Sequence, residues 1–259
     1  DGIIYNIYLK PDLTWHDGEA LTTADVAFTV DLMKAGEGYL SEDLVNLWKS
    51  IEVVTINDLY LQMLLPEAYS PFLDYLSFGI LPEHLLGGLT MAEVADSEFN
   101  LQPVGSGPYQ LSNLTIEDGV ITGITLEAFE DSTTPPYLQE INFRYYPDEQ
   151  SAYQAYKDQF VQGVSEIPNN LLADALTQDE LSIYSGRLPE ISMVLLNLND
   201  PGLPFFQDVN IRKALMLSIN RQKLINTLFN GQAIAANGVI FPESWAYLTS
   251  LTPMDYDMD

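Results

Sequence analysis

The side chains that could bind a metal or act as nucleophiles are few in kind and scattered along the chain. The sequence has two histidines, His16 and His84, and no cysteine. Neither histidine has carboxylates at a local spacing that would complete a metal-ligand set. The absence of cysteine excludes disulfides, thiolate nucleophiles and thiolate metal sites. We therefore expect no metal site.

Carboxylates are too numerous to indicate a catalytic pair. With 37 Asp and Glu residues, two carboxylates close in sequence are expected by chance. There is no Gly-x-Ser-x-Gly elbow and no His-Glu-x-x-His motif. The acidic run at 255–259 lacks the glycine and the final glutamate of a calcium loop. We predict no catalytic residue and no cofactor. A hydrolase would require two carboxylates about 5–10 Å apart in a deep pocket.

The glycine-rich segment Gly105-Ser106-Gly107-Pro108 is not a phosphate-binding loop. It lacks the lysine of a P-loop and the spacing of a dinucleotide fingerprint, and Pro108 removes an amide donor. Glycines permit positive φ and close backbone approach. The segment therefore predicts a tight crossing of the chain, after which Tyr109 begins a strand.

The segment from Trp15 to Val26 has the pattern of a turn that leads into a capped helix. Asp17-Gly18 predicts the turn, and Thr22 or Thr23 is a favourable N-cap. A carboxylate in the first helical turn complements the positive end of the helix dipole. We interpret the segment as a structural unit with no reacting group.

The rest of the chain alternates strand and helix patterns. Hydrophobic periodicity and turn residues predict a mixed α and β fold. The expected strands are 3–9, 51–56, 59–65, 109–116, 120–129, 141–145 and 192–198. Five helical segments are expected. The first follows the turn at 17–18, the second spans 71–86 with an interruption at 79–82, and the third follows a cap at Asp148. The fourth begins at 171–176, and the fifth runs from Asp208 to Phe229.

Composition restricts the classes of partner. The 259 residues are 47% apolar, enough for a real core, and the net charge is −27. Lys10, Lys34 and Lys49 are the only basic residues before Arg144. The negative electrostatic potential of such an acidic chain repels phosphate backbones and anionic lipids, which excludes nucleic acid as a partner. The acidity fits a soluble exported protein, and attraction of a cationic ligand is the alternative. No apolar run approaches the roughly 20 residues of a membrane span.

Three segments, in this order, resemble a known family. They are Trp15-His16-Asp17-Gly18-Glu19-Ala20-Leu21-Thr22-Thr23-Ala24-Asp25-Val26, Pro103-Val104-Gly105-Ser106-Gly107-Pro108-Tyr109, and Val209-Asn210-Ile211-Arg212-Lys213-Ala214-Leu215. The chain is similar to the family 5 extracellular solute-binding proteins of ABC transporters. The final residues resemble a family motif cut midway, so we expect a piece of a larger protein.

The resemblance implies a periplasmic-binding-protein-like II fold with two lobes. The first lobe would be largely present and the second only begun. The implied division is a first-lobe subdomain at 1–102, a first-lobe core segment at 103–192, and a crossing strand with the start of the second lobe at 193–259. No signal peptide or lipidated cysteine is visible, and we expect that any such segment was removed with the true N-terminus.

The implied function is capture of an oligopeptide or a related small solute at the outer face of the cytoplasmic membrane, for delivery to ABC permease subunits. Contact with the membrane would come only through a missing anchor. The resemblance places Tyr39, Glu166 and Asn197 at the ligand cleft. It gives structural roles to Asp17, Gly18, Gly105, Gly107, Pro108, Tyr109 and Arg212, and for Arg212 we expect an ion pair to the preceding strand. The alternative from another class is a solute-sensing regulatory module of the same fold.

Overall fold

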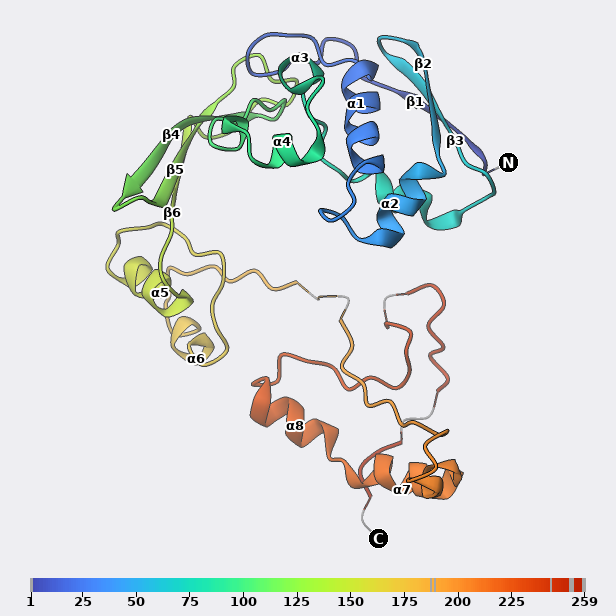
Figure 1. The fold of residues 1–259 in the computed structure, drawn as a ribbon. Helices are drawn as coiled ribbons and strands as arrows, with labels where there is room; N and C mark the ends of the chain where they lie inside the picture. The colour runs from blue at the N-terminus through green and yellow to red at the C-terminus, as the bar shows by residue number, and fades with distance from the viewer. Residues whose placement is uncertain (1, 187, 189, 243, 252–253, 258–259) are drawn as a thin grey trace. The chain divides into compact units, whose positions relative to one another are not determined.

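The computed structural model describes residues 2–186, 188, 190–242, 244–251 and 254–257 (Figure 1). The chain divides into two compact units, Asp1–Pro147 and Asp148–Asp259. Among the described residues, both β-sheets belong to the first unit, and the regular elements of the second unit are helices. The mixed α and β fold predicted from the sequence is confirmed. The predicted boundaries at 102 and 192 stay a prediction.

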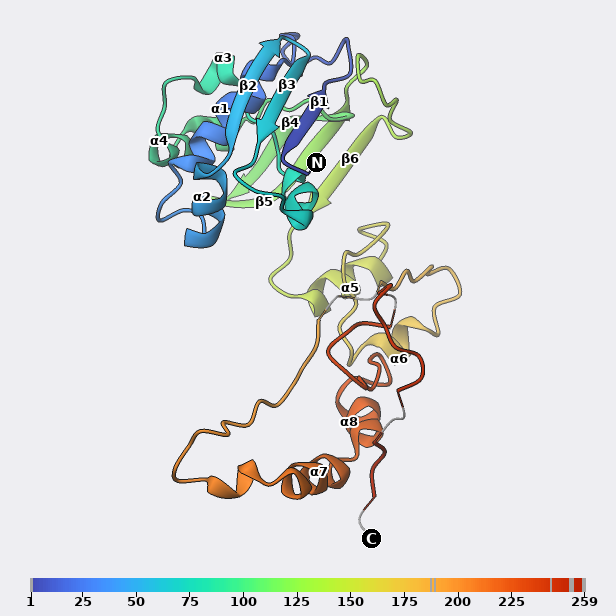
Figure 2. The same cartoon turned by 90° about the vertical axis from the view of Figure 1, so that its right-hand side faces the viewer.

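The first sheet is antiparallel and has three strands. Its order is β1 (Ile4–Tyr8), β3 (Tyr60–Leu64) and β2 (Glu52–Asn57), and Figure 2 shows the three strands side by side with β3 in the middle. The predicted N-terminal strand and the predicted hairpin are both confirmed. Leu61 and Met63 are buried because alternate residues of β3 point toward the helices.

Two helices cover the inner face of this sheet. Helix α1 (Thr23–Lys34) begins at Thr22, and α2 (Glu42–Lys49) ends beside the start of β2. Their apolar residues and those of the sheet form one buried cluster. Its members are Val26, Val30, Trp48, Ile51, Leu61, Met63, Leu65 and Phe72.

The chain between the two sheets forms short helical pieces. They are a 3-10 helix (Ser70–Leu76), α3 (Glu83–Leu86), α4 (Met91–Ala95) and a 3-10 turn (Glu98–Asn100). The predicted interruption at 79–82 is confirmed, although the first piece is 3-10 rather than α-helical. Leu32, Leu86 and Val94 form a second buried cluster that joins α1 to α3 and α4.

The second sheet is an antiparallel meander of β4 (Tyr109–Glu117), β5 (Val120–Ala128) and β6 (Glu140–Arg144). Asp118 (φ 51°) and Gly119 (φ 79°) join β4 to β5. Two successive positive φ angles are typical of the tight turns whose twist matches that of a hairpin. The predicted hairpin is confirmed by this turn and by the pairing of β4 with β5. The strand predicted at 141–145 is confirmed by β6, which pairs with β5.

The second unit consists of short helices joined by long irregular segments. Helix α5 (Glu149–Lys157) begins at the predicted cap, because the carboxylate of Asp148 accepts a hydrogen bond from the Ser151 amide at 2.7 Å. Lys157 Nζ lies 3.3 Å from Asp174 of α6 (Leu172–Ala175). This ion pair ties the two helices together, beside the buried ring of Tyr153.

Two predictions for the second unit are wrong. The helix expected from Asp208 to Phe229 is two helices, α7 (Val209–Ser218) and α8 (Arg221–Leu228), preceded by a 3-10 turn (Pro204–Gln207). The helix breaks because Asn220 acts as an N-cap, and its side chain accepts a hydrogen bond from the Lys223 amide at 2.8 Å. Residues 192–198 are not a strand, because no described strand lies beside them to complete a ladder.

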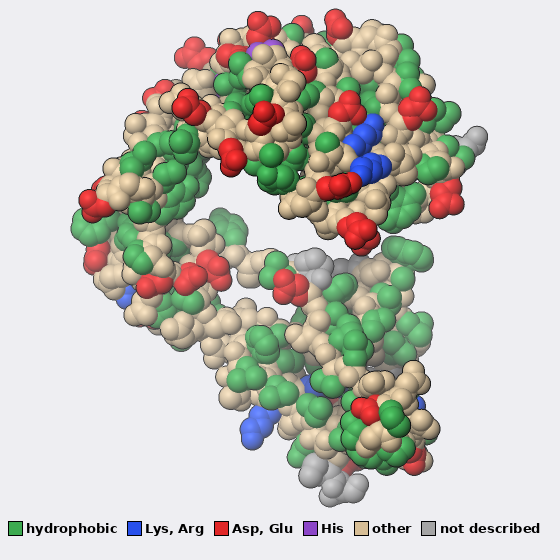
Figure 3. All heavy atoms as spheres, in the orientation of Figure 1, with side chains coloured by type: hydrophobic (Ala, Val, Ile, Leu, Met, Phe, Trp, Pro, Cys, Tyr) green, Lys and Arg blue, Asp and Glu red, His purple; other side chains and the backbone are tan. Residues whose placement is uncertain are grey.

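Many Asp and Glu side chains lie on the surface of the first unit, in keeping with its acidic composition (Figure 3). Acidic side chains are spread over many elements instead of gathering at one point. Over the described residues, no helix combines the length and the apolar character that crossing a bilayer demands.

Candidate functional site

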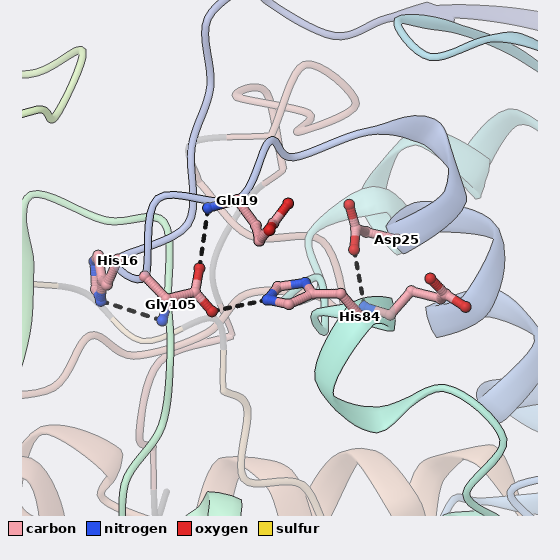
Figure 4. Close-up of polar contacts among 7 residues, drawn as sticks. His16, Glu19, Asp25, His84 and Gly105 are labelled. Atoms are coloured by element: carbon pink, nitrogen blue, oxygen red, sulfur yellow. Dashed lines mark hydrogen bonds and ion pairs between the residues drawn. The ribbon is translucent and has the colours of Figure 1, made fainter.

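The first two sequence motifs meet at the side chain of His16 (Figure 4). Its Nδ1 accepts a hydrogen bond from the Gly105 amide at 3.2 Å, and its Nε2 lies 3.0 Å from the carbonyl oxygen of Gly107. The His16 amide also donates to the Gly105 carbonyl at 2.8 Å. The turn before α1 and the crossing before β4 are therefore one junction, joined across 89 residues of sequence.

These partners fix the form of the imidazole ring. An amide can only donate and a carbonyl can only accept, so the Nδ1 of His16 carries a lone pair and its Nε2 carries the proton. The ring is thus the neutral Nε2–H tautomer, and both of its nitrogens are used within the protein. The ring centroids of His16 and Phe129, which lies just beyond β5, are 4.9 Å apart, and the two ring planes are tilted by 59°.

The two glycines of the crossing differ in their surroundings. Neither Gly105 nor Gly107 adopts a positive φ. The expected close approach is confirmed at Gly105, where an added Cβ would lie 3.1 Å from the Cε1 of His16. At Gly107 an added Cβ would meet nothing within 4 Å. Pro108 and Tyr109 then lead into β4, and the Pro108 carbonyl accepts from the Phe129 amide at 2.9 Å.

Asp17 joins the same turn to helix α3. One carboxylate oxygen lies 2.8 Å from the Nε2 of His84, and the other accepts from the Glu19 amide at 3.2 Å. Partial burial raises the pKa of Asp17, but the hydrogen bonds from His84 and Glu19 outweigh it, so this pKa lies below its usual value. Gly18 has a φ of 91°, which confirms the predicted turn.

Asp25 holds the starts of two helices. Its Oδ2 accepts from the Thr22 amide at 2.8 Å and completes the capping box of α1. Its Oδ1 accepts from the Glu83 amide at the start of α3, also at 2.8 Å. The residue is only 4% exposed, and a buried carboxylate is tolerated here because backbone amides satisfy both of its oxygens.

The sequence indicated the cap at Thr22 but not the roles of Asp25 and His84 toward distant segments. His84 lies 67 residues from Asp17 along the chain, and Glu83 lies 58 residues from Asp25. No local pattern encodes such pairs. Among the described residues, no group of three His, Cys, Asp or Glu side chains stands close enough to hold a metal ion.

The third motif lies in the second unit, and Arg212 has a different role from the predicted one. One guanidinium nitrogen, Nη1, donates to the carbonyls of Phe206 at 2.7 Å and Gln207 at 2.9 Å. Among the described residues no carboxylate pairs with Arg212, so the expected ion pair is wrong. The guanidinium instead satisfies the carbonyls that the 3-10 turn leaves free before α7.

The three residues predicted to bind ligand lie in different units. Tyr39 follows Gly38 (φ 84°) in the first unit, and its side chain is 55% exposed. Glu166 and Asn197 are exposed in the second unit. The side chain of Asn197 accepts from the Asn199 amide at 3.0 Å and so stabilises a local turn. Their role in binding stays a prediction.

A shallow groove runs along α8, within the second unit. The surface of this groove is mostly apolar, and none of the predicted ligand residues lies in it. The groove is lined by Ile219, Asn220, Lys223, Leu224, Thr227 and Leu228. It lacks the convergent polar groups that a solute site uses. We therefore do not identify it as the ligand site.

Comparison with known proteins identifies the family. The bacterial extracellular solute-binding proteins of family 5 (middle region) match residues 1–259. The oligopeptide-binding protein AppA of Bacillus subtilis is 28% identical over 263 residues, which cover 99% of this chain and 46% of the relative. The dipeptide-binding protein of Escherichia coli is 26% identical, with 99% of this chain and 50% of the relative covered.

Solved structures show the same fold. The protein AppA from Clostridium difficile superposes with a TM-score of 0.80 at 23% identity, covering 99% of this chain and 53% of that one. NikZ from Campylobacter jejuni, in complex with Ni(L-His), gives a TM-score of 0.74 at 24% identity, covering 99% and 50%. The chain thus spans about half the length of the curated relatives that it matches. It belongs to the bacterial extracellular solute-binding proteins of family 5.

Proposed function

We propose that this chain is part of a receptor that captures an oligopeptide or a related small solute outside the cytoplasmic membrane and delivers it to ABC permease subunits. The observation that carries the proposal is the family match over residues 1–259.

The proposed mechanism is capture between two lobes. Solute-binding clefts combine apolar walls with a few convergent polar groups, and closure is favoured by contacts that form only in the closed state. The first lobe would lie largely within this chain, and the second lobe would only begin in it. Tyr39, Glu166 and Asn197 are the proposed ligand contacts. Their exposure in the structure leaves each side chain available to a ligand.

The first experiment identifies the solute. The protein that contains this chain in its full length is purified without denaturation, and mass spectrometry is applied to the small molecules released from it. We expect a peptide or small solute at near-stoichiometric amount. A full-length protein that binds no solute, and whose gene lies beside a regulator instead of permease and ATPase genes, would contradict transport and favour the regulatory alternative.

The second experiment tests the ligand contacts. In the full-length protein, Tyr39→Ala should weaken the affinity for the identified solute about tenfold or more, as expected for loss of an aromatic side chain that the bound ligand covers. Tyr137→Ala is the matched control, because Tyr137 lies in the same unit and its side chain is fully exposed. Equal affinities for both variants would remove Tyr39 from the site.

The third experiment uses the 259-residue chain alone. Because it spans about half the length of its relatives, we expect it to bind the same solute weakly or not at all. Isothermal titration calorimetry measures this directly. Tight stoichiometric binding by this chain would show that the whole site lies within residues 1–259.

A further inference from the structure

The protonation state of His16 decides whether one bond of the junction can form. Its Nδ1 accepts from the Gly105 amide at 3.2 Å, and this hydrogen bond is part-buried. A protonated imidazole is a donor at both nitrogens and keeps no acceptor. The Nδ1–H of a protonated ring and the Gly105 N–H would be two donors facing each other. The hydrogen bond between them would therefore be lost.

The ring has little room to avoid this conflict by turning. Gly105 lies so close that an added Cβ would meet the Cε1 of His16 at 3.1 Å. The Nε2 of the ring lies 3.0 Å from the Gly107 carbonyl, so a rotation that moved Nδ1 away from Gly105 would also break this second bond. The backbone bond from the His16 amide to the Gly105 carbonyl does not depend on the ring. Protonation therefore opens the side-chain part of the junction and leaves the backbone part.

The direct partners of the ring do not ionise. In the described part of the chain, its hydrogen-bond and ring partners are Gly105, Gly107 and Phe129. The charged or titratable side chains on the surrounding segments are Asp17 and Glu19 of the same turn, Glu83 and His84 of α3, and Glu130 and Asp131 after Phe129. Most of these are carboxylates, and negative charge nearby favours a positive ring. The ring can therefore take up a proton while the unit stays folded.

His84 responds to acid in the opposite way, although it contacts the same turn (Figure 4). Its Nε2 lies 2.8 Å from a carboxylate oxygen of Asp17. A carboxylate only accepts, so this nitrogen carries a proton in both the neutral and the charged ring. Protonation of His84 turns the bond into an ion pair, and charge-assisted bonds are the stronger kind. As the pH falls, His84 keeps its bond to the turn and His16 loses one.

We propose that the side chain of His16 is an acid-sensitive latch within the first unit. The neutral ring bonds the turn before α1 to the crossing before β4, and protonation frees the Gly105 amide so that the crossing becomes more mobile. Histidine ordinarily changes charge between pH 5 and 8. Because the folded junction needs the neutral ring, the stability that this latch contributes is present above that range and is lost as the pH falls through it. The latch requires no solute, so it stands apart from the proposed function.

Hydrogen exchange of the Gly105 amide tests the latch directly. Its protection, taken relative to the intrinsic exchange rate at each pH, should fall about fivefold or more between about pH 7.5 and about pH 5, as for loss of one hydrogen bond. The amide of Val30, in the buried cluster on α1, is the internal control and should keep its protection. Constant protection at Gly105 would overturn the proposal. So would an equal fall at Val30, which would indicate acid unfolding of the whole unit.

Two glutamine variants separate the two histidines. His16→Gln keeps one acceptor and one donor but does not ionise, so the protection of the Gly105 amide should no longer depend on pH in this range. His84→Gln is the matched control, because it keeps a donor for Asp17 and removes the other titrating ring. It should leave the pH dependence at Gly105 as in the wild type. The reverse pattern, in which only His84→Gln abolishes the pH dependence, would assign the effect to His84 and overturn the latch.

Nitrogen NMR of the labelled imidazole rings gives a measurement on the wild-type chain. The chain has two histidines, so the signals that His84→Gln removes identify those of His16 by elimination. At about pH 7.5 the Nδ1 of His16 should have the chemical shift of an unprotonated nitrogen, and at about pH 5 that of a protonated one. Protection of the Gly105 amide should fall with the same midpoint. A ring that stays neutral at pH 5, or a ring that is protonated without any change at Gly105, would refute the latch.

Discussion

Replacing His16 by phenylalanine tests whether the junction between the two motifs is structural. His16→Phe keeps a flat ring against Phe129 but removes both nitrogens. The Gly105 amide would lose an acceptor and the Gly107 carbonyl would lose a donor. A hydrogen bond contributes about 0.5–1.5 kcal/mol net to stability. Since the bond to Gly107 is exposed and that to Gly105 only part-buried, we expect a loss of about 1–2 kcal/mol in total.

The assay must report on the first unit alone. Of the three tryptophans, Trp15 and Trp48 are buried in the first unit and Trp245 is exposed in the second. In a Trp245→Phe background, tryptophan fluorescence therefore follows unfolding of the first unit. For a domain of this size the expected loss corresponds to a decrease of about 3–6 °C in melting temperature.

Two further measurements separate the junction from a general effect of the substitution. Hydrogen exchange of the Gly105 amide should accelerate in His16→Phe, while exchange within α5 of the second unit stays the same. His16→Gln retains one acceptor and one donor and should recover part of the stability. The reasoning is refuted if His16→Phe unfolds at the wild-type temperature with unchanged exchange at Gly105.

Three other predictions follow from the same junction. Gly105→Ala places a Cβ 3.1 Å from the nearest histidine carbon and should destabilise the first unit by about 1 kcal/mol, whereas Gly107→Ala meets nothing within 4 Å and should be neutral in the same melting assay. Because the pKa of Asp17 is lowered in the folded protein, its contribution to stability is present above the unfolded pKa of 3.8. That contribution is lost as the pH falls through the lower folded pKa. Asp17→Asn should therefore remove this part of the acid dependence when the free energy of unfolding is measured against pH. Asp25→Asn leaves only one acceptor oxygen for two backbone amides and should cost about 1–3 kcal/mol in urea unfolding, while the exposed control Asp31→Asn should change stability by less than about 0.5 kcal/mol.

Local signals in the sequence were sufficient for the elements that depend on local chemistry. The turn at Asp118-Gly119 predicts its hairpin because few residues adopt two successive positive φ angles. The sequence offers Thr22 or Thr23 as the cap of α1, and Thr22 is the residue that caps it; Asp148 predicts the start of α5. The side chains of Thr22 and Asp148 accept hydrogen bonds from amides two or three residues ahead. In each case the sequence neighbours contain both partners of the interaction.

The failures occur where the decisive partner is distant or where two local signals compete. The break at Asn220 had a signal, since asparagine favours caps, but the apolar periodicity on both sides outweighed it in the prediction. The apolar run at 192–198 has strand composition, yet a strand exists only with a neighbour to pair with. The contact of His16 with Gly105 has no sequence pattern at all, because only the fold brings those residues together.

The junction also bears on how far cargo can be inferred from family resemblance. Both nitrogens of His16 are engaged by backbone groups, and both carboxylate oxygens of Asp25 accept backbone amides. Neither ring nitrogen of His16 is left for a solute, and Asp25 is only 4% exposed. The polar side chains of the first two motifs therefore stabilise the first unit, and their contacts carry no information about the solute. The proposed ligand contact Tyr39 has an exposed side chain, and we expect substitutions there to change solute affinity without changing the stability of the junction.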